Sequence, residues 1–380
     1  MTRRSPWITD DVAELYEVAR AFFATEVAAR REQWSREQCV DREFWRKAAG
    51  LGLLCASIPE EYGGGGGSFL HQAAIQQAYC ATGDRSWSNS VHSGIVAHYI
   101  LDYGTEEQKH RWLPGMATAD MIAAIAMTEP SAGSDLKAIT TRAVRDGDSY
   151  LISGSKTFIS NGSQADLIVV AAKTDPDAGA KGISLIVVET ADAPGFTRGK
   201  VLDKIGQHGA DTSELFFDNV RVPATNLLGD EGQGFAMMMS QLRQERLIIG
   251  IGAVAATELA LELTVEHAKQ RKMFGKRLFD LQNTRFVLAE CATRTRIARV
   301  FLDDCVGAHM AGELEAATAA MCKWWLTDVQ CRVIDECLQL FGGYGYMREY
   351  PIAQMYADAR AQRIYGGANE IQKELIARSL

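Results

Sequence analysis

One stretch of the sequence places a carboxylate beside an otherwise small and apolar surface, which is the setting of a general base. Glu245 and Arg246 begin this run, QERLIIGIGAVAA at residues 244–256. On a helix, Glu245 shares its face with Ile249 and Gly252. A carboxylate bordering an apolar surface has a raised pKa, as a base working near neutral pH requires. The residues alone leave a second interpretation equally open, a solvated charge pair at the start of a helix.

Two further segments offer groups that suit a ring system or a phosphate. AIAMTEPSAGSD, residues 124–135, runs from a strand-like start into a loop of exposed N–H groups and hydroxyls. SGSKTFISNGS, residues 153–163, offers the aromatic face of Phe158 between hydroxyl side chains. Composition by itself favours simpler interpretations: a strand-to-loop turn, and a strand with a buried Phe158 that ends in an Asn-Gly turn.

Three later segments contain cations or glycines. RKMFGKRL at residues 271–278, followed by Gln282, has cations that could hold a pyrophosphate, although a solvated basic junction is the usual case. QLFGGYGY at residues 339–346 allows close approach of a backbone or a ligand, or simply ends a helix. YGGANEIQ at residues 365–372 opens the last helix, whose free N–H groups suit an anion or a carbonyl oxygen.

Composition excludes several classes of function. The net charge of −8 argues against non-specific binding to nucleic acid. We expect no integral membrane association, because no apolar run approaches the roughly 20 residues that span a bilayer. The eight cysteines form no C-x-x-C pair and the seven histidines are scattered, so we expect reduced thiols, a cytoplasmic protein and no metal site.

The chain divides into three zones of periodicity. Residues 1–125 read as helices, and Asp10 or Asp11 could cap the first of them. Residues 126–235 contain short β-branched runs separated by turn residues, which predicts a β-sandwich or barrel. Residues 236–380 return to a helical period in four long stretches, the last at 351–378, which predicts a four-helix bundle. The expected fold is therefore α+β, with a β-domain between two helical domains.

Taken together and in this order, the segments resemble the acyl-CoA dehydrogenase family over nearly the whole chain. TEPSAGSD, KTFISNG, RKMFGK, QLFGGYGY and the IYGG turn carry the resemblance. The pattern is most similar to the long-chain subgroup, which has QERL after the β-domain and GG in the C-terminal turn. The resemblance implies the same three-domain fold, an FAD cofactor, an acyl-CoA substrate and a homotetramer built as a dimer of dimers. It also implies electron-transferring flavoprotein as the electron acceptor.

The resemblance also assigns site residues. The FAD-binding set would be Ile125, Met127, Thr128, Gly133, Ser134, Phe158, Ile159, Ser160, Arg271, Phe274, Gln282, Gln339, Leu340, Gly342, Gly343, Ala368, Asn369 and Glu370. Those from Arg271 to Gly343 would reach the FAD of a neighbouring subunit. The acyl-CoA contacts would be Ser134, Arg243, Arg246, Tyr365 and Gly366.

The sequence departs from the family at the base. Most members have a glutamate after the tyrosine of the C-terminal turn, where this chain has Gly366. The long-chain and isovaleryl subgroups carry their glutamate where this chain has Glu245, so the resemblance makes Glu245 the base. The backbone N–H of Gly366 would then donate to the thioester carbonyl. The expected reaction is α,β-dehydrogenation to a trans-2-enoyl-CoA.

Three alternatives stay open from the sequence. An acyl-CoA oxidase or a flavin monooxygenase on the same fold would differ only in the access of oxygen to the flavin. A flavin- or acyl-binding protein without catalysis would be consistent with the missing glutamate at Gly366. Chain length and branching of the acyl group depend on the wall near residues 85–100 and on the helix of Glu245.

Overall fold

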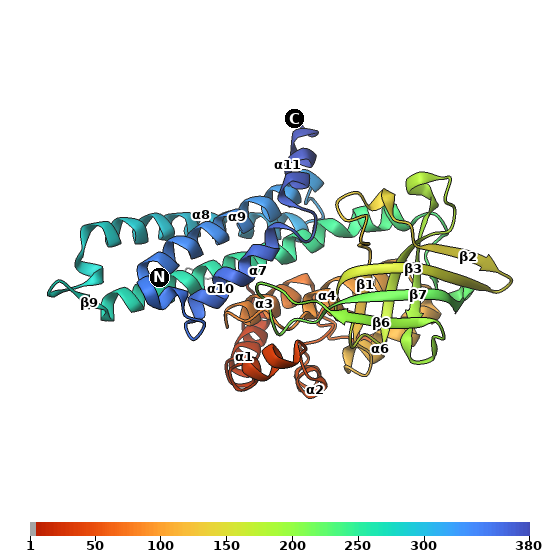
Figure 1. The fold of residues 1–380 in the computed structure, drawn as a ribbon, viewed down its shortest axis with the longest axis horizontal. Helices are drawn as coiled ribbons and strands as arrows, with labels where there is room; N and C mark the ends of the chain where they lie inside the picture. Colours follow the sequence, from red (N-terminus) through yellow and green to blue (C-terminus); the bar gives the residue numbers. More distant parts are fainter. Residues whose placement is uncertain (1–4) are drawn as a thin grey trace.

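The computed structural model describes residues 5–380, and these form two helical parts flanking a β-domain in the chain order (Figure 1). The first part consists of α1 (Asp10–Glu37), α2 (Arg42–Gly50), α3 (Phe69–Cys80), α4 (Asn89–Val91), the π-turn η2 (His92–Val96), α5 (Ala97–Tyr103) and α6 (Glu106–Ala117). The last part consists of α7 (Gly234–Gln270), α8 (Gln282–Met310), α9 (Ala316–Phe341), α10 (Pro351–Ala359) and α11 (Asn369–Ala377).

Local sequence signals fix the ends of the N-terminal helices. The Thr105 side chain accepts from the Gln108 N–H and the Gln108 side chain accepts in return, which forms a capping box for α6. Asp41 caps α2 by accepting from the Phe44 N–H at 2.9 Å. Thr9 occupies the N-cap of α1, which corrects the predicted caps Asp10 and Asp11, because both acids lie inside the first turn.

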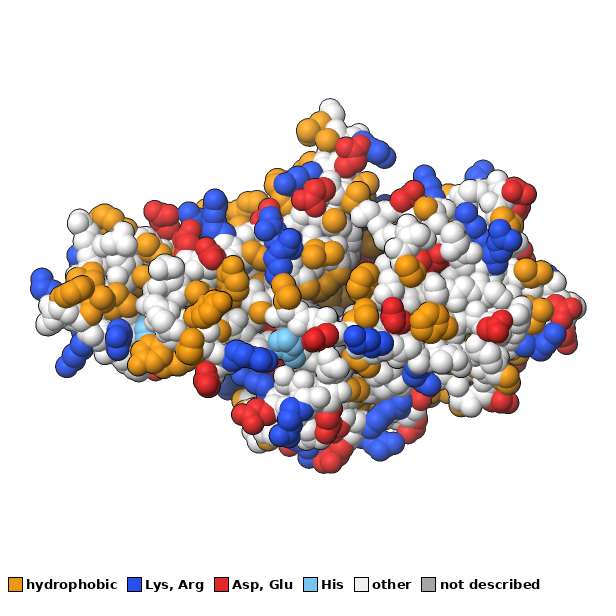
Figure 2. Space-filling view, viewed as in Figure 1, with side chains coloured by type: hydrophobic (Ala, Val, Ile, Leu, Met, Phe, Trp, Pro, Cys, Tyr) orange, Lys and Arg blue, Asp and Glu red, His pale blue; other side chains and the backbone are white. Residues whose placement is uncertain are grey.

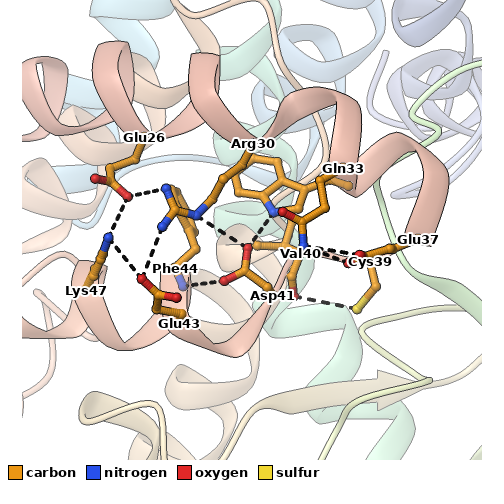
Figure 3. Close-up of polar contacts among 11 residues, drawn as sticks. Glu26, Arg30, Gln33, Glu37, Cys39, Val40, Asp41, Glu43, Phe44 and Lys47 are labelled. Atoms are coloured by element: carbon orange, nitrogen blue, oxygen red, sulfur yellow. Dashed lines mark hydrogen bonds and ion pairs between the residues drawn. The ribbon is translucent and has the colours of Figure 1, made fainter.

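Charged side chains link α1 to α2 (Figure 3). Arg30 contacts Glu26, lies 3.6 Å from Asp41 and 3.3 Å from Glu43. Lys47 bridges the two helices through Glu26 at 3.2 Å. These groups are partly exposed, so the network fixes geometry more than it adds stability.

The β-domain is one connected sheet that divides into two antiparallel groups. Strands β6 (Phe196–Val201), β7 (Thr212–Pro223), β3 (Ser149–Ser160) and β2 (Arg142–Asp146) form the first group, and β4 (Leu167–Lys173), β5 (Ile183–Glu189) and β8 (Leu227–Leu228) form the second. A single pair, Arg142 with Lys173, joins them, and β1 (Ala123–Ala126) pairs parallel with β4.

Strand β4 is buried on both faces, which explains its unbroken apolar sequence. Ile168 and Val170 face the core between the strand groups, whereas Leu167 and Val169 pack against the core that includes α5 and α6. The β-domain is therefore fixed against the N-terminal helices.

Helix α7 runs from the β-domain to the far end of the helical bundle (Figure 1). By length and composition it could cross a membrane, but 61% of its most apolar window is buried inside the protein. Its apolar side chains pack against α3, α8 and α9. A core helix of a globular domain accounts for this pattern.

The predicted helix 351–378 is wrong, because it is two helices. Helix α10 ends at Ala359, and α11 begins at Asn369 after a turn. Gly366 and Gly367 in this turn have φ of +64° and +85°, which an α-helix does not accommodate. The break creates the turn that approaches Glu245.

Candidate active site

Glu245 lies in the interior of α7, with 8% of its surface exposed. The Tyr99 hydroxyl, on α5, donates a hydrogen bond to Glu245 Oε1 at 3.1 Å. Burial raises the pKa of Glu245 to about 7, and the hydrogen bond from Tyr99 and the charge of Arg246 oppose this rise. The interpretation as a solvated charge pair is therefore wrong, since Arg246 is buried as well.

The two arginines near Glu245 have different surroundings. Arg246 is buried and its Nε has no hydrogen-bond partner. Arg243 is exposed one turn earlier on α7. Arg246 is therefore near the carboxylate, whereas Arg243 is available to solvent or to a ligand outside.

The turn of Gly366 comes to the same face of α7 as Glu245. A Cβ on Gly366 would clash with Cδ1 of Ile249, one helical turn beyond Glu245. The structure therefore brings together Glu245 and Gly366, which are 121 positions apart in the chain (366 − 245).

The carbonyl groups of this turn are engaged, but the N–H of Gly366 is not. Gln372 Nε2 donates to Gly366 O at 3.1 Å, and Lys323 Nζ donates to Gly367 O at 2.8 Å. Among the residues that the structure describes, the Gly366 N–H makes no hydrogen bond. A fixed turn with a free donor is the arrangement that an oxyanion site needs.

Lys323 on α9 is buried and stabilises the turn of Gly366 by hydrogen bonds. Besides Gly367 O, its Nζ donates to Asn369 Oδ1 at 2.8 Å. Burial, supported by the nearby charge of Arg246, lowers the pKa of Lys323 to about 7. The Asn369 amide also donates to Asp328 Oδ1 at 3.0 Å, so this predicted cofactor-binding side chain is used within the protein.

The predicted flavin segments of the β-domain meet at one edge. Thr157 N–H donates to Thr128 O at 3.0 Å, which joins the loop after β1 to strand β3. Ile125 and Met127 are partly buried there, Gly133 and Ser134 are exposed, and Ser160 is partly buried. Ile159 differs, because its side chain packs in the core between the strand groups.

Phe158 is 65% exposed, so its prediction as a buried strand residue is wrong. Its φ of +59° lies in the left-handed region, at an irregularity in the pairing of β3 with β7. A bulky residue held exposed in this conformation is strained, and such strain concentrates at ligand sites. The ring is thus presented outward beside Thr128 and its neighbours.

A buried ion pair anchors this edge. Lys156 Nζ lies 2.9 Å from Glu129 Oε1 and also donates to Met127 O at 3.1 Å. Glu129 further accepts from the N–H groups of Thr140 and Thr141, at 2.6 and 2.9 Å. The charge of Lys156 and these hydrogen bonds outweigh burial and lower the pKa of Glu129 to about 2.

The predicted FAD residues from Arg271 to Gly343 lie at the opposite end of the molecule (Figure 1). Arg271 precedes a hairpin of β9 (Lys272–Met273) and β10 (Lys276–Arg277), whose tip residue Phe274 is 88% exposed. The Arg271 guanidinium lies 5.6 Å from the ring centre of Tyr344. This contact joins the hairpin end, which includes Phe274 and is followed by Gln282 at the start of α8, to the loop of Gln339, Leu340, Gly342 and Gly343, where Leu340 packs in one cluster with Met273 and Leu278. Thr128 and Phe158 lie on the β-domain instead.

Between these ends, Ala368 and Glu370 flank Asn369 at the start of α11. Figure 2 shows that the surface is hollowed between α11 and the β-domain and that hydrophobic side chains line the hollow. Tyr365, 42% exposed, precedes the turn of Gly366.

Sequence reasoning did not identify Tyr99, Lys323, Glu129 and Lys156. Glu129 lies in the motif TEPSAGSD and Lys156 in KTFISNG. A lysine among buried residues of a strand predicts a buried partner of opposite charge, and this signal could have identified the pair. Tyr99 is 146 positions from its partner Glu245, and Lys323 is 44 positions from its partner Gly367. Only folding brings these residues together, so no local sequence pattern identifies Tyr99 or Lys323.

A buried carboxylate beside a free N–H, in a chain of two helical parts that flank a β-domain, is the arrangement of a three-domain flavin-dependent oxidoreductase. The family description "Acyl-CoA dehydrogenase" matches in its N-terminal domain at residues 9–120, its middle domain at 124–220 and its C-terminal domain at 232–380. The chain belongs to the acyl-CoA dehydrogenase family, which consists of FAD-dependent oxidoreductases.

Individual relatives agree with this assignment. The long-chain specific acyl-CoA dehydrogenase of Rattus norvegicus mitochondria is 45% identical over 96% of this chain and 85% of its own length. The crystal structure of an acyl-CoA dehydrogenase from Geobacillus kaustophilus superposes with a TM-score of 0.96 at 46% identity, covering 99% of both chains. A glutaryl-CoA dehydrogenase from Mycobacterium smegmatis, in complex with FADH2, has a TM-score of 0.91 at 29% identity, covering 99% of this chain and 96% of its own.

Proposed function

We propose that Glu245 is the base of an α,β-dehydrogenation of acyl-CoA. The observation that carries the proposal is its burial beside Tyr99 and the turn of Gly366, with a pKa raised to about 7. A carboxylate with this pKa is ionised in a large fraction of molecules at neutral pH and is still a strong enough base to remove a proton.

The chain's own residues account for proton removal. The Gly366 N–H donates to the thioester carbonyl oxygen and thereby makes the α-proton more acidic. A preorganised donor of this kind typically stabilises the transition state by roughly 3–4 kcal/mol. Glu245 takes the proton, and Tyr99 holds the carboxylate in place. Lys323 and Gln372 keep the turn rigid by binding its carbonyls.

The residues at the edge of the β-domain fit a flavin, because they combine an exposed aromatic ring with hydroxyls and free backbone groups. Thr128, Phe158 and Ser160 would hold it there, with Ala368 to Glu370 on the side of α11. When bound, FAD supplies the acceptor for the hydride that leaves the β-carbon. Ser134, Arg243 and Arg246 would line the path of the CoA thioester.

Replacement of Glu245 by Gln tests the base. The variant should bind FAD normally, because the change keeps size and removes only the charge, but lose at least 100-fold in the rate of flavin bleaching by acyl-CoA. Glu262→Gln, an exposed position on the same helix, is the matched control and should bleach at the normal rate. Bleaching by Glu245→Gln at the rate of the control would contradict the assignment.

We also propose a homotetramer in which each FAD contacts two subunits. The support is the separation within one chain of Thr128 and Phe158 from Arg271 and the Gln339–Gly343 loop (Figure 1). The exposed Phe274 and Tyr346 at the hairpin end suit burial against a second copy. Two copies related by a twofold axis would complete two equivalent sites.

We propose electron-transferring flavoprotein as the electron acceptor and the cytoplasm as the compartment. The eight free thiols support a reducing compartment. Anaerobic electron transfer to that partner, with little peroxide formed in air, separates a dehydrogenase from an oxidase.

We further propose domain limits at 125/126 and 235/236, supported by the starts of β1 at Ala123 and of α7 at Gly234.

A further inference from the structure

Lys323 is a buried lysine whose hydrogen-bond acceptors are all neutral. None of its surface is exposed, and its Nζ donates to Gly367 O and to Asn369 Oδ1, each at 2.8 Å. Among residues 5–380, no carboxylate lies at salt-bridge distance from it, because the nearby Asp328 pairs with Arg363 at 2.6 Å. A hydrophobic residue of similar volume is often no less stable at such a position, which points to a role for the charge itself.

The charges that face Lys323 come from several elements. Arg246 on α7 and Arg363 after α10 carry the same sign as Lys323, whereas Asp328 on α9 and Glu370 on α11 carry the opposite sign. Asp328 is engaged by Arg363, and Glu370 is exposed, so solvent screens its attraction. The ammonium of Lys323 is therefore the cation of this region that no buried anion neutralises.

Lys323 also lies close to the N–H that is proposed to bind the thioester. A Cβ built on Gly366 would be 4.0 Å from Lys323 Cε. From the lengths of the intervening bonds and one hydrogen bond, Nζ lies no more than about 11 Å from an oxygen bound at the Gly366 N–H. At this limit, and at an effective dielectric constant of about 20, a unit charge shifts an equilibrium by at least roughly ten-fold.

The same charge acts on the oxygen rather than on the base. The effects on the pKa of Glu245 are burial, the hydrogen bond from Tyr99 and the charge of Arg246. When Glu245 takes the α-proton, the negative charge moves from its carboxylate to the thioester oxygen at Gly366. A cation near the oxygen stabilises the state after this transfer more than the state before it, and only such differential stabilisation accelerates a reaction.

We propose that Lys323 is a positioning residue whose ammonium charge, fixed behind the Gly366–Gly367 turn, stabilises the enolate oxygen that forms when the α-proton leaves. This inference rests on the proposed function, because the Gly366 N–H locates the thioester oxygen. It goes beyond the rigidity of the turn, since a neutral side chain with the same hydrogen bonds would not supply the effect.

The test uses a 3-thia-acyl-CoA, which has sulfur in place of the β-carbon and so loses the α-proton without passing on a hydride. Its enolate, stacked on oxidised flavin, absorbs at long wavelength, which measures the ratio of bound enolate to bound thioester. The probe is the 3-thia analogue of the straight-chain acyl-CoA that bleaches the wild-type flavin fastest. Near pH 6, Lys323 is protonated in most molecules, because its pKa is about 7. Lys323→Met should then lower the ratio at least about ten-fold.

Gln372→Met is the matched control. Gln372 is equally buried and neutral, and its Nε2 donates to Gly366 O at 3.1 Å and to Gly367 O at 3.0 Å. This variant removes hydrogen bonds from the same turn but removes no charge, so its enolate ratio should change far less than that of Lys323→Met. Equal effects of the two variants would mean that only mechanical support of the turn matters, and would overturn the inference.

A second variant covers the case in which Lys323→Met does not retain FAD. Lys323→Gln keeps a polar end group but carries no charge, so it should show the same loss of enolate. A wild-type ratio of enolate to thioester in Lys323→Gln would also overturn the inference.

The same measurement separates this inference from the proposed function. Glu245→Gln keeps Lys323 but should form no enolate. If no acyl-CoA bleached the wild-type flavin, or if Glu245→Gln formed the enolate as fully as the wild type, the proposed function would be wrong. If the wild type and Lys323→Met formed the enolate equally, while Glu245→Gln did not, only the role of Lys323 would be wrong.

Discussion

The Tyr99 hydroxyl donates to Glu245 Oε1 at 3.1 Å, although the two residues come from different domains of the sequence. This hydrogen bond favours the ionised carboxylate and works against burial, which favours the protonated one. The pKa of about 7 is the balance of burial against this hydrogen bond and the charge of Arg246.

Tyr99→Phe should therefore raise the pKa of Glu245 above 7. Because the base acts as its carboxylate, the rising limb of kcat/KM against pH should move to higher pH. Activity near pH 6 should fall, whereas activity well above the new pKa should approach that of the wild type. A pH series of flavin reduction measures the shift, and Tyr103→Phe is the control, since Tyr103 lies on α5 with its ring 6.1 Å from that of Tyr99, whereas the hydrogen bond to Glu245 comes from Tyr99. An unchanged limb would show that Tyr99 does not tune the base.

The buried pair of Glu129 and Lys156 should couple stability to FAD binding. Lys156→Met leaves the Glu129 carboxylate buried without its cation, which typically costs 3–5 kcal/mol in the free energy of unfolding. The loop of Thr128 should lose its anchor, so flavin content should fall too. Urea unfolding and the flavin absorbance per protein measure both effects.

The exposed pair of Arg221 and Asp146, on the same sheet, provides the comparison. Arg221→Met should cost roughly 0–1 kcal/mol and leave the flavin content unchanged. If Lys156→Met behaved like this surface variant, the proposed anchoring role would be wrong.

Gly366→Ala should disturb the turn whose N–H is proposed to bind the thioester carbonyl. A side chain at φ +64° costs roughly 1–2 kcal/mol, and the added Cβ meets Cδ1 of Ile249. Shortening that neighbour by Ile249→Val should recover the steric part of the loss but not the backbone part. Thermal unfolding of both single variants and the double variant measures the coupling, and strictly additive effects would contradict the contact.

A shared FAD site predicts complementation between subunits. Arg271→Met and Thr128→Val should each bind FAD weakly, because each removes one side of the site. In mixed dimers isolated with two affinity tags, one site carries both changes and the other carries neither, so one site per pair should bind FAD at wild-type affinity. Flavin content measures this, and mixed dimers as weak as either parent would argue for a site within one chain.

The sequence by itself determined the order of domains, the strands and the long helices. Periodicity of apolar residues is a local property, so it separated the β-zone at residues 126–235, in which strand β3 covers Ser149–Ser160, from the helical zones. Motifs such as TEPSAGSD and QERL indicated the family and Glu245 because the residues of each motif are adjacent in the chain. The helix 351–378 was predicted wrongly, since apolar periodicity outweighed the two glycines that break it.

Only the tertiary structure decided the environment of the base. Whether Glu245 is solvated or buried depends on α5 and on the turn of Gly366, which periodicity does not locate. The same holds for Phe158, whose exposure depends on its own left-handed backbone conformation at an irregularity in the pairing of β3 with β7. A pKa near 7 arises from burial and from contacts between distant residues, so folding sets it.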